Sequence, residues 1–167
     1  MEIEIEAIQS MTGTKHEVAE CLAECMSNAV VLYFKAHGHH WNVKGPDFTE
    51  FHGFFAMIAA DVYGSLDDIA ENILKLDVGM NAPFRLVDFA RMSSIEDIEV
   101  GNDAMAMCRD LLAANGVMHA CLNDCFKAAT AADCQAIANF IASRLDMHEK
   151  WDWQLKAHLN ASSGGIR

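Results

Sequence analysis

The chain has 167 residues, 52% of them hydrophobic, and a formal net charge of −12. This length suits one domain with its own core, and 22% charged residues with 2 prolines exclude wholesale disorder. The 12 basic residues are scattered singly, which excludes a basic patch for a polyanion, and no apolar run reaches the ~18 residues of a membrane helix. The acidic start is unlike a signal peptide, so we expect one cytoplasmic domain over residues 1–167.

Apolar residues repeat at helical spacing along most of the chain. The first long helix is expected to begin at a capping box formed by Thr14 and Glu17 and to run to about Trp41. After a Gly-Pro turn, a second long helix begins at Asp47 and runs to about Leu76. The remaining expected elements are a short connecting helix over 84–92, a third long helix over 101–129 and a fourth over 133–159.

This order of elements predicts an all-α fold. Four helices of about 25–28 residues, with a short helix in the crossover between the second and third, describe a four-helix bundle with one long connection. We expect an N-terminal tail over residues 1–13 and a flexible C-terminal tail over residues 161–167.

Six cysteines are spaced in a way that argues against disulfides. Cys21 and Cys25, like Cys121 and Cys125, are four apart within one expected helix, where two side chains rarely reach disulfide geometry. A four-cysteine metal site needs short spacings around a turn, and this spacing is absent. We therefore interpret all six as reduced, buried core residues, and most of the ten methionines as core or interface residues.

Two histidines and two acidic residues are the candidate metal ligands. His40 ends the first long helix and His52 lies in the second turn of the next, so the turn between them brings the two side chains near each other. Asp67 and Glu71 are four residues apart and share one helix face. At 100° per residue, Asp67 lies about 60° and Glu71 about 100° from His52, so all three follow one stripe.

The same helix arithmetic separates these residues within one chain. His52 and Asp67 lie about 22 Å apart along the axis, so one ion cannot bind both. They converge if the helix meets its own copy antiparallel about a two-fold axis near residue 61 or 62, where Ala59, Ala60 and Gly64 would allow close approach. From spacing alone, a solvated acidic face and surface histidines remain the alternative.

The sequence resembles the Dps family of mini-ferritins, within the ferritin-like superfamily. The block from His40 to Phe48, followed by His52 and by the segment 67–71, carries the resemblance. The linker segment 93–95 and the segment 148–150 with Trp153 are similar as well, and the resemblance covers about residues 15–160.

The resemblance implies a ferritin-like bundle that assembles as a homododecamer around a hollow. It implies a ferroxidase that oxidises Fe(II), typically with hydrogen peroxide, and stores Fe(III) mineral, which protects DNA under oxidative stress. The metal ligands would be His40 and His52 of one subunit with Asp67 and Glu71 of its neighbour. Trp41 would lie beside this site and intercept radicals.

One departure from the family pattern concerns the metal site. The family has an Asp four residues after its second His ligand, where this chain has Ala56. Asp61 and Asp68 point about 180° and 160° away from His52, and His37 is the nearest spare ligand. The missing carboxylate predicts weaker iron binding. The alternatives are therefore zinc at the same four ligands and a degenerate metal-binding shell with weak ferroxidase activity.

A second departure concerns DNA. Family members that coat DNA often use a Lys-rich terminal tail, whereas the first ten residues here carry three Glu and no Lys or Arg, and the chain ends on a lone Arg167. Because binding to DNA needs several phosphate contacts, a DNA-compacting structural protein is the disfavoured third alternative. Asp133, at the start of the last expected helix, fits a helix cap as well as an acidic pore residue.

Overall fold

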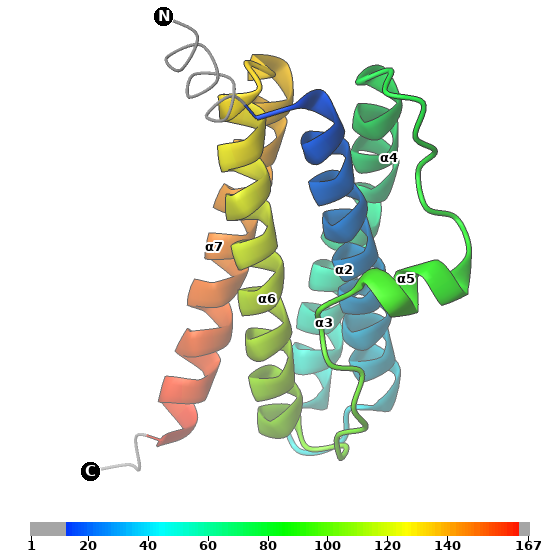
Figure 1. Ribbon diagram of the computed structural model, residues 1–167. Helices are drawn as coiled ribbons and strands as arrows, with labels where there is room; N and C mark the ends of the chain where they lie inside the picture. Colours follow the sequence, from blue (N-terminus) through cyan, green and yellow to red (C-terminus); the bar gives the residue numbers. More distant parts are fainter. Residues whose placement is uncertain (1–12, 164–167) are drawn as a thin grey trace, which may run out of the picture.

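A computed structural model describes residues 13–163, and every regular element in this range is a helix (Figure 1). The order of elements matches the four expected long helices and the short one in the crossover. Their bounds are α2 Lys15–Asn42, α3 Phe48–Gly64, α4 Leu66–Lys75, α5 Leu86–Met92, α6 Ala104–Ala131 and α7 Gln135–Ser163. The prediction of an all-α four-helix bundle is therefore confirmed.

The long helices lie side by side around one apolar core (Figure 1). α2 runs antiparallel to α6 and packs against it and against α3, while α7 packs along α6. The short helix α5 crosses the outside of α2 within the long connection. None of the helices in the described part of the chain is both long and apolar enough to span a membrane.

The start of α2 follows from its sequence. The Glu17 backbone N–H donates to Thr14 Oγ1 at 3.2 Å, and the Thr14 N–H donates to Glu17 Oε2 at 2.6 Å. This reciprocal pair satisfies two N–H groups that the first helical turn leaves without partners, so the predicted capping box is confirmed. Asp103 caps α6 more simply, accepting from the Ala106 N–H at 2.8 Å.

The second long helix is interrupted, contrary to the prediction of one helix to about Leu76. α3 ends at Gly64 and α4 begins at Leu66, with Ser65 between them at φ −85° and ψ −14°. Both the Ser65 N–H and its hydroxyl donate to the Val62 carbonyl, at 3.2 and 2.7 Å. This tightens the backbone over one turn, because a serine side chain competes for helix carbonyls. The interruption is brief, since the Ile69 N–H already bonds Ser65 O at 3.1 Å.

The connection between α6 and α7 also differs from the expectation. Asp133 does not cap the last helix, because its backbone has a φ of 55° and closes the end of α6. The Cys134 N–H bonds Ala129 O at 2.8 Å and the Asp133 N–H bonds Thr130 O at 3.1 Å, a Schellman motif with Asp133 at the left-handed position.

The predicted tails are only partly covered by the described residues. Residues 1–12 and 164–167 lie outside them, so most of the expected N-terminal tail and the end of the C-terminal tail cannot be compared. Within the described range, α7 continues four residues beyond its expected end at Leu159, to Ser163.

Candidate metal centre

His40 and His52 hold each other in place across the turn between α2 and α3. His40 Nδ1 lies 2.7 Å from the His52 carbonyl oxygen, and His52 Nδ1 lies 2.7 Å from the His40 carbonyl oxygen. The two rings stack with centroids 3.8 Å apart, and Phe48 stacks on the other side of His52 at 4.8 Å. The predicted proximity of the two histidines is confirmed.

This arrangement fixes the tautomer of both rings. A carbonyl oxygen only accepts, so each Nδ1 carries the proton and donates it. In the neutral imidazole the Nε2 lone pair is then free, and it is the atom that would bind a metal ion. Carbonyl acceptors of this kind orient the histidines of metal sites, so the pair is organised for coordination before any ion arrives.

The two acidic candidates lie elsewhere on the same subunit. Asp67 and Glu71 are exposed on α4, and Glu71 makes a 3.6 Å ion pair with Lys75 one turn later. Among residues 13–163 of one subunit, no three His, Cys, Asp or Glu side chains are placed to hold one metal ion. His40 and His52 are therefore brought together, and Asp67 and Glu71 are not brought to them within the chain.

A stripe of exposed residues on α3 and α4, hereafter the exposed stripe, runs from near His52 to Asp67, Glu71 and the end of α4. It contains large apolar side chains that a lone subunit leaves 55–61% accessible, and small residues between them. Its members are Met57, Ala60, Tyr63, Gly64, Asp67, Glu71 and Leu74. Ala59, expected beside the two-fold axis, is instead 3% exposed and packs into the core of the subunit. An apolar face of this kind typically marks a protein contact.

His37 and Trp41 lie next to the histidine pair on α2. The His37 Nδ1 is 3.0 Å from the Tyr33 hydroxyl, and its ring lies 4.4 Å from that of Trp41 and 5.6 Å from that of His40. The ring nitrogen of His37 thus bonds a side chain, whereas the Nδ1 atoms of His40 and His52 bond backbone carbonyls. Trp41 is 62% exposed, so its indole is accessible beside the site.

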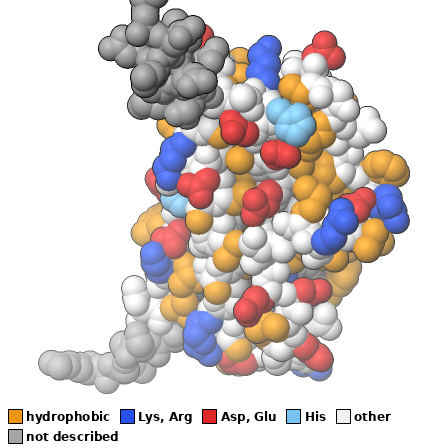
Figure 2. All heavy atoms as spheres, viewed as in Figure 1, with side chains coloured by type: hydrophobic (Ala, Val, Ile, Leu, Met, Phe, Trp, Pro, Cys, Tyr) orange, Lys and Arg blue, Asp and Glu red, His pale blue; other side chains and the backbone are white. Residues whose placement is uncertain are grey.

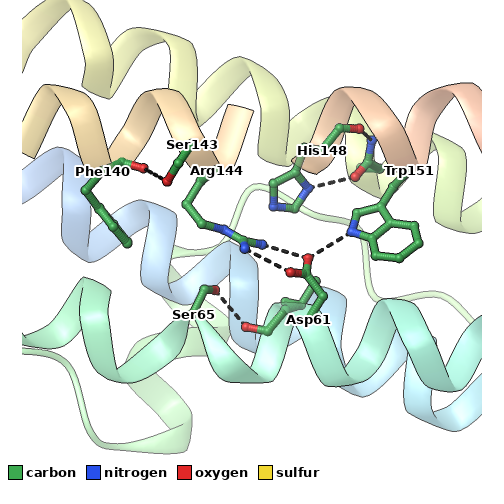
Figure 3. A network of polar contacts seen from close by, with 9 residues as sticks. Asp61, Ser65, Phe140, Ser143, Arg144, His148 and Trp151 are labelled. Atoms are coloured by element: carbon green, nitrogen blue, oxygen red, sulfur yellow. Dashed lines mark hydrogen bonds and ion pairs between the residues drawn. The ribbon is translucent and has the colours of Figure 1, made fainter. Parts of the chain in front are cut away.

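Asp61 does not replace the carboxylate missing at Ala56. Its two oxygens accept from Arg144 on α7 at 3.0 and 2.8 Å, and one also accepts from Trp151 Nε1 at 2.8 Å (Figure 3). Burial raises the pKa of Asp61, but these hydrogen bonds outweigh it and leave the pKa below its usual value. The sequence prediction that Asp61 points away from His52 is confirmed. Asp68 is exposed on α4.

The bundle interior holds a second polar pair that sequence reasoning missed. His148 Nδ1 lies 2.8 Å from Asn115 Oδ1, and Asn115 Nδ2 donates to the His148 carbonyl at 2.9 Å. Burial lowers the pKa of His148 to about 3, so this ring is neutral. Ordinary ferritin-like sites place carboxylates with a Glu-x-x-His pair inside the bundle. Here amide, guanidinium and imidazole groups lie inside the bundle, and the carboxylates of Asp61 and Asp110 are already paired, with Arg144 and with Lys35 and His39.

Comparisons with known proteins agree with the fold. The model of the ferritin-like domain family matches residues 19–163. The DNA protection during starvation protein of Brevibacillus brevis is 30% identical over 148 residues, covering 89% of this chain and 98% of that protein. A Dps crystal structure from Bacillus brevis has a TM-score of 0.82 at 30% identity, covering 87% of this chain and 96% of that one. The Vibrio cholerae Dps structure, described as a member of a broad superfamily of ferritin-like diiron-carboxylate proteins, has a TM-score of 0.82 at 23% identity, covering 87% and 90%.

Proposed function

Because this chain belongs to the Dps family of ferritin-like proteins, we propose that it is a cytoplasmic ferroxidase that stores iron and protects against oxidative stress. The observation that carries the proposal is the reciprocal pair of His40 and His52, whose Nε2 atoms are both free for a metal ion. Within the described part of a single subunit, no carboxylate joins this pair to form a metal site. Fe(II) needs ligands that balance its charge, so a second subunit has to supply them.

Asp67 and Glu71 of the neighbouring subunit are the proposed carboxylates. They lie at the far end of the exposed stripe from His52, so an antiparallel pairing of two stripes brings the histidines of each copy to the acids of the other. The apolar side chains of the stripe would be buried in the same contact. Two such sites form per dimer, and six dimers would make the proposed homododecamer.

Fe(II) is the substrate of the proposed reaction. Two Fe(II) ions give one electron each to hydrogen peroxide, which takes up two protons and leaves as two water molecules. The Fe(III) produced would be stored as mineral within the shell. Trp41, exposed next to the site, would be oxidised by stray radicals in place of other targets.

Anaerobic Fe(II) titration followed by hydrogen peroxide tests this proposal. We expect oxidation faster than in buffer alone, about two Fe(II) consumed per peroxide, and Fe(III) that stays soluble and elutes with the protein. Oxidation no faster than in buffer would contradict the proposal.

A second candidate is a shell that binds metal without efficient oxidation, and Ala56 favours it. The half-buried methyl group at this position offers no ligand one turn after His52. Two histidines and two carboxylates would also satisfy zinc, which prefers four ligands. Tight zinc binding combined with slow iron oxidation would support this candidate over the first.

Direct DNA binding is the least supported function. On the face shown in Figure 2, acidic side chains are spread over α2 and α6, and basic side chains stand apart except around α5. With a net charge of −12, the subunit would repel phosphates. A gel-shift titration at low salt tests this, since the absence of any shift removes DNA compaction as a function.

A further inference from the structure

Four of the six cysteines gather between α2 and α6. Cys25 Sγ lies 3.0 Å from Cys121 Sγ, and Cys21 and Cys125 lie one helical turn away on the same two helices. The two helices are antiparallel (Figure 1), and Cys25 meets Cys121, so Cys21 lies at the level of Cys125. The interpretation of the cysteines as core residues did not predict that α2 and α6 bring these four together. All four are free thiols.

Two of these thiols can be reached from solvent. Cys21 and Cys121 are half-buried and line a groove of about 280 Å³ between α2, α6 and the linker residue Ser94. Cys25 and Cys125 are fully buried behind them. The cluster therefore has an accessible thiol, Cys121, and a buried thiol, Cys25, in contact with it. Redox-active cysteine pairs have this arrangement: the accessible thiol is oxidised to a sulfenic acid, and the second thiol converts it to a disulfide.

The groove favours small neutral oxidants. Glu24 lies on its rim, anchored by the Ser94 hydroxyl at 3.0 Å, and Asp124 lies on the opposite rim, paired with Lys127 at 2.9 Å. The negative charge of Glu24 repels anions such as glutathione disulfide, which is also large for this space. Hydrogen peroxide is uncharged and close to water in size.

We propose that Cys25 and Cys121 form a redox-active pair that hydrogen peroxide oxidises to a disulfide between α2 and α6. The Cys121 thiolate attacks one peroxide oxygen, the O–O bond breaks, and Cys121 becomes a sulfenic acid while hydroxide leaves and takes up the thiol proton as water. Cys25 then attacks the Cys121 sulfur, its proton leaves with the sulfenic hydroxyl as a second water, and the S–S bond forms. Two thiols are oxidised and one peroxide is reduced to two waters.

The hydrogen bonds within the cluster support the first step. Thiol donors Cys21 and Cys25 lower the pKa of Cys125 to about 5, whereas contact with Cys121 and burial raise the pKa of Cys25. The lowered pKa of Cys125 makes it an acceptor for a proton that a neighbouring thiol of the cluster releases.

Iron-free protein, kept in chelator, tests the proposal independently of the iron chemistry. It is treated with a small excess of hydrogen peroxide, denatured, alkylated and mapped by mass spectrometry. We expect free thiols to fall from six to four per subunit, a mass loss of about 2 Da before alkylation, and a cross-link that fragmentation assigns to Cys25 and Cys121. The same concentration of glutathione disulfide should oxidise the pair at least tenfold more slowly.

Two variants provide the controls. Cys121→Ser should abolish the disulfide, and Cys108→Ser, which removes a buried cysteine elsewhere on α6, should leave it unchanged. Mapping of the wild-type protein does not depend on either variant folding. Six intact thiols after peroxide treatment, a cross-link between Cys21 and Cys125 instead, or oxidation to sulfonic acid without a disulfide would each overturn the proposal.

Discussion

Asp61 and Arg144 form a bidentate ion pair between α3 and α7, with one carboxylate oxygen facing each terminal nitrogen of the guanidinium at 3.0 and 2.8 Å (Figure 3). Both side chains are largely buried, at 18% and 11% exposure. Pairing of this kind fixes how two helices sit against each other, because a charge left alone in this environment is costly.

Replacing Asp61 should therefore destabilise the subunit. Asp61→Asn leaves the Arg144 charge without its partner, and we expect a loss of about 3 kcal/mol in the free energy of unfolding. Asp68→Asn, on the exposed face of α4, should change it by less than about 0.5 kcal/mol. Urea unfolding followed by circular dichroism measures both, and equal effects from the two variants would contradict the assigned role.

The pH dependence of this pair follows from the lowered pKa of Asp61. Its contribution to stability is complete above the unfolded-state pKa of about 3.9, and it is lost as the pH falls through the lower folded-state pKa. Asp61→Asn should remove this part of the acid transition. The variant should therefore lose less stability than wild type between pH 4 and pH 2.

His148 predicts a separate loss of stability at milder acidity. Its folded-state pKa of about 3 lies below the unfolded-state pKa of about 6.5. At a pH between these two values, His148 is therefore protonated in the unfolded chain and neutral in the folded chain. Between pH 6.5 and pH 5 this should cost about 2 kcal/mol of stability. This fall in the free energy of unfolding with decreasing pH should disappear in His148→Gln. It should persist in His16→Gln, whose side chain is exposed. Urea titrations at fixed protein concentration measure it.

The parts of the fold that the sequence predicted are those set by local patterns. The capping box of Thr14 and Glu17 involves residues three apart, and the helix spacing that places Asp61 opposite His52 involves one element. Both predictions are confirmed. The break at Ser65 was missed because a serine in a helical pattern either continues the helix or tightens it, and the pattern does not distinguish the two.

Relationships between helices were predicted less well. The cysteine pairs at 21 and 25 and at 121 and 125 have identical spacing, which is the signal of two facing helices, but their meeting depends on the register of α2 against α6. That register is set by the whole core. The proposed metal site likewise depends on how two surfaces meet, here those of two subunits. The convergence of His40 and His52 with Asp67 and Glu71 of a neighbouring subunit therefore stays a prediction.

Substitutions at the histidine pair should separate ligands from neighbours. His52→Ala removes one free Nε2 and one of the two reciprocal hydrogen bonds, and we expect zinc or Fe(II) binding at least about 100-fold weaker. His37→Ala removes a ring bonded to Tyr33 and should bind nearly as wild type. Anaerobic calorimetric titration measures both, and equal losses in the two variants would assign His37 as a ligand.

Restoring the missing carboxylate should strengthen the site. Ala56 lies one helical turn after His52 and is half-buried, so an Asp there reaches the same region. If the site is weakened by this residue, Ala56→Asp should raise the rate of Fe(II) oxidation about tenfold or more, equivalent to about 1.4 kcal/mol of barrier. Stopped-flow absorbance with hydrogen peroxide measures the rate. An unchanged rate would show that the native ligand set is already sufficient.

Gly64 offers a test of the proposed dimer contact that leaves the subunit intact. A side chain added at Gly64 meets no atom within 4 Å in the single subunit, and the residue lies in the exposed stripe. Gly64→Arg should therefore leave the fold unchanged but place a charged side chain where two stripes meet. We expect the large assembly to dissociate in analytical ultracentrifugation and peroxide-driven oxidation to fall with it, because each site then loses the partner's carboxylates. Gly116→Arg on α6 is the matched control, because a Cβ added at Gly116 also meets no atom within 4 Å. This variant should keep both the large assembly and the oxidation activity. An intact assembly with full activity in Gly64→Arg would place the contact, and with it the shared site, on another face of the subunit.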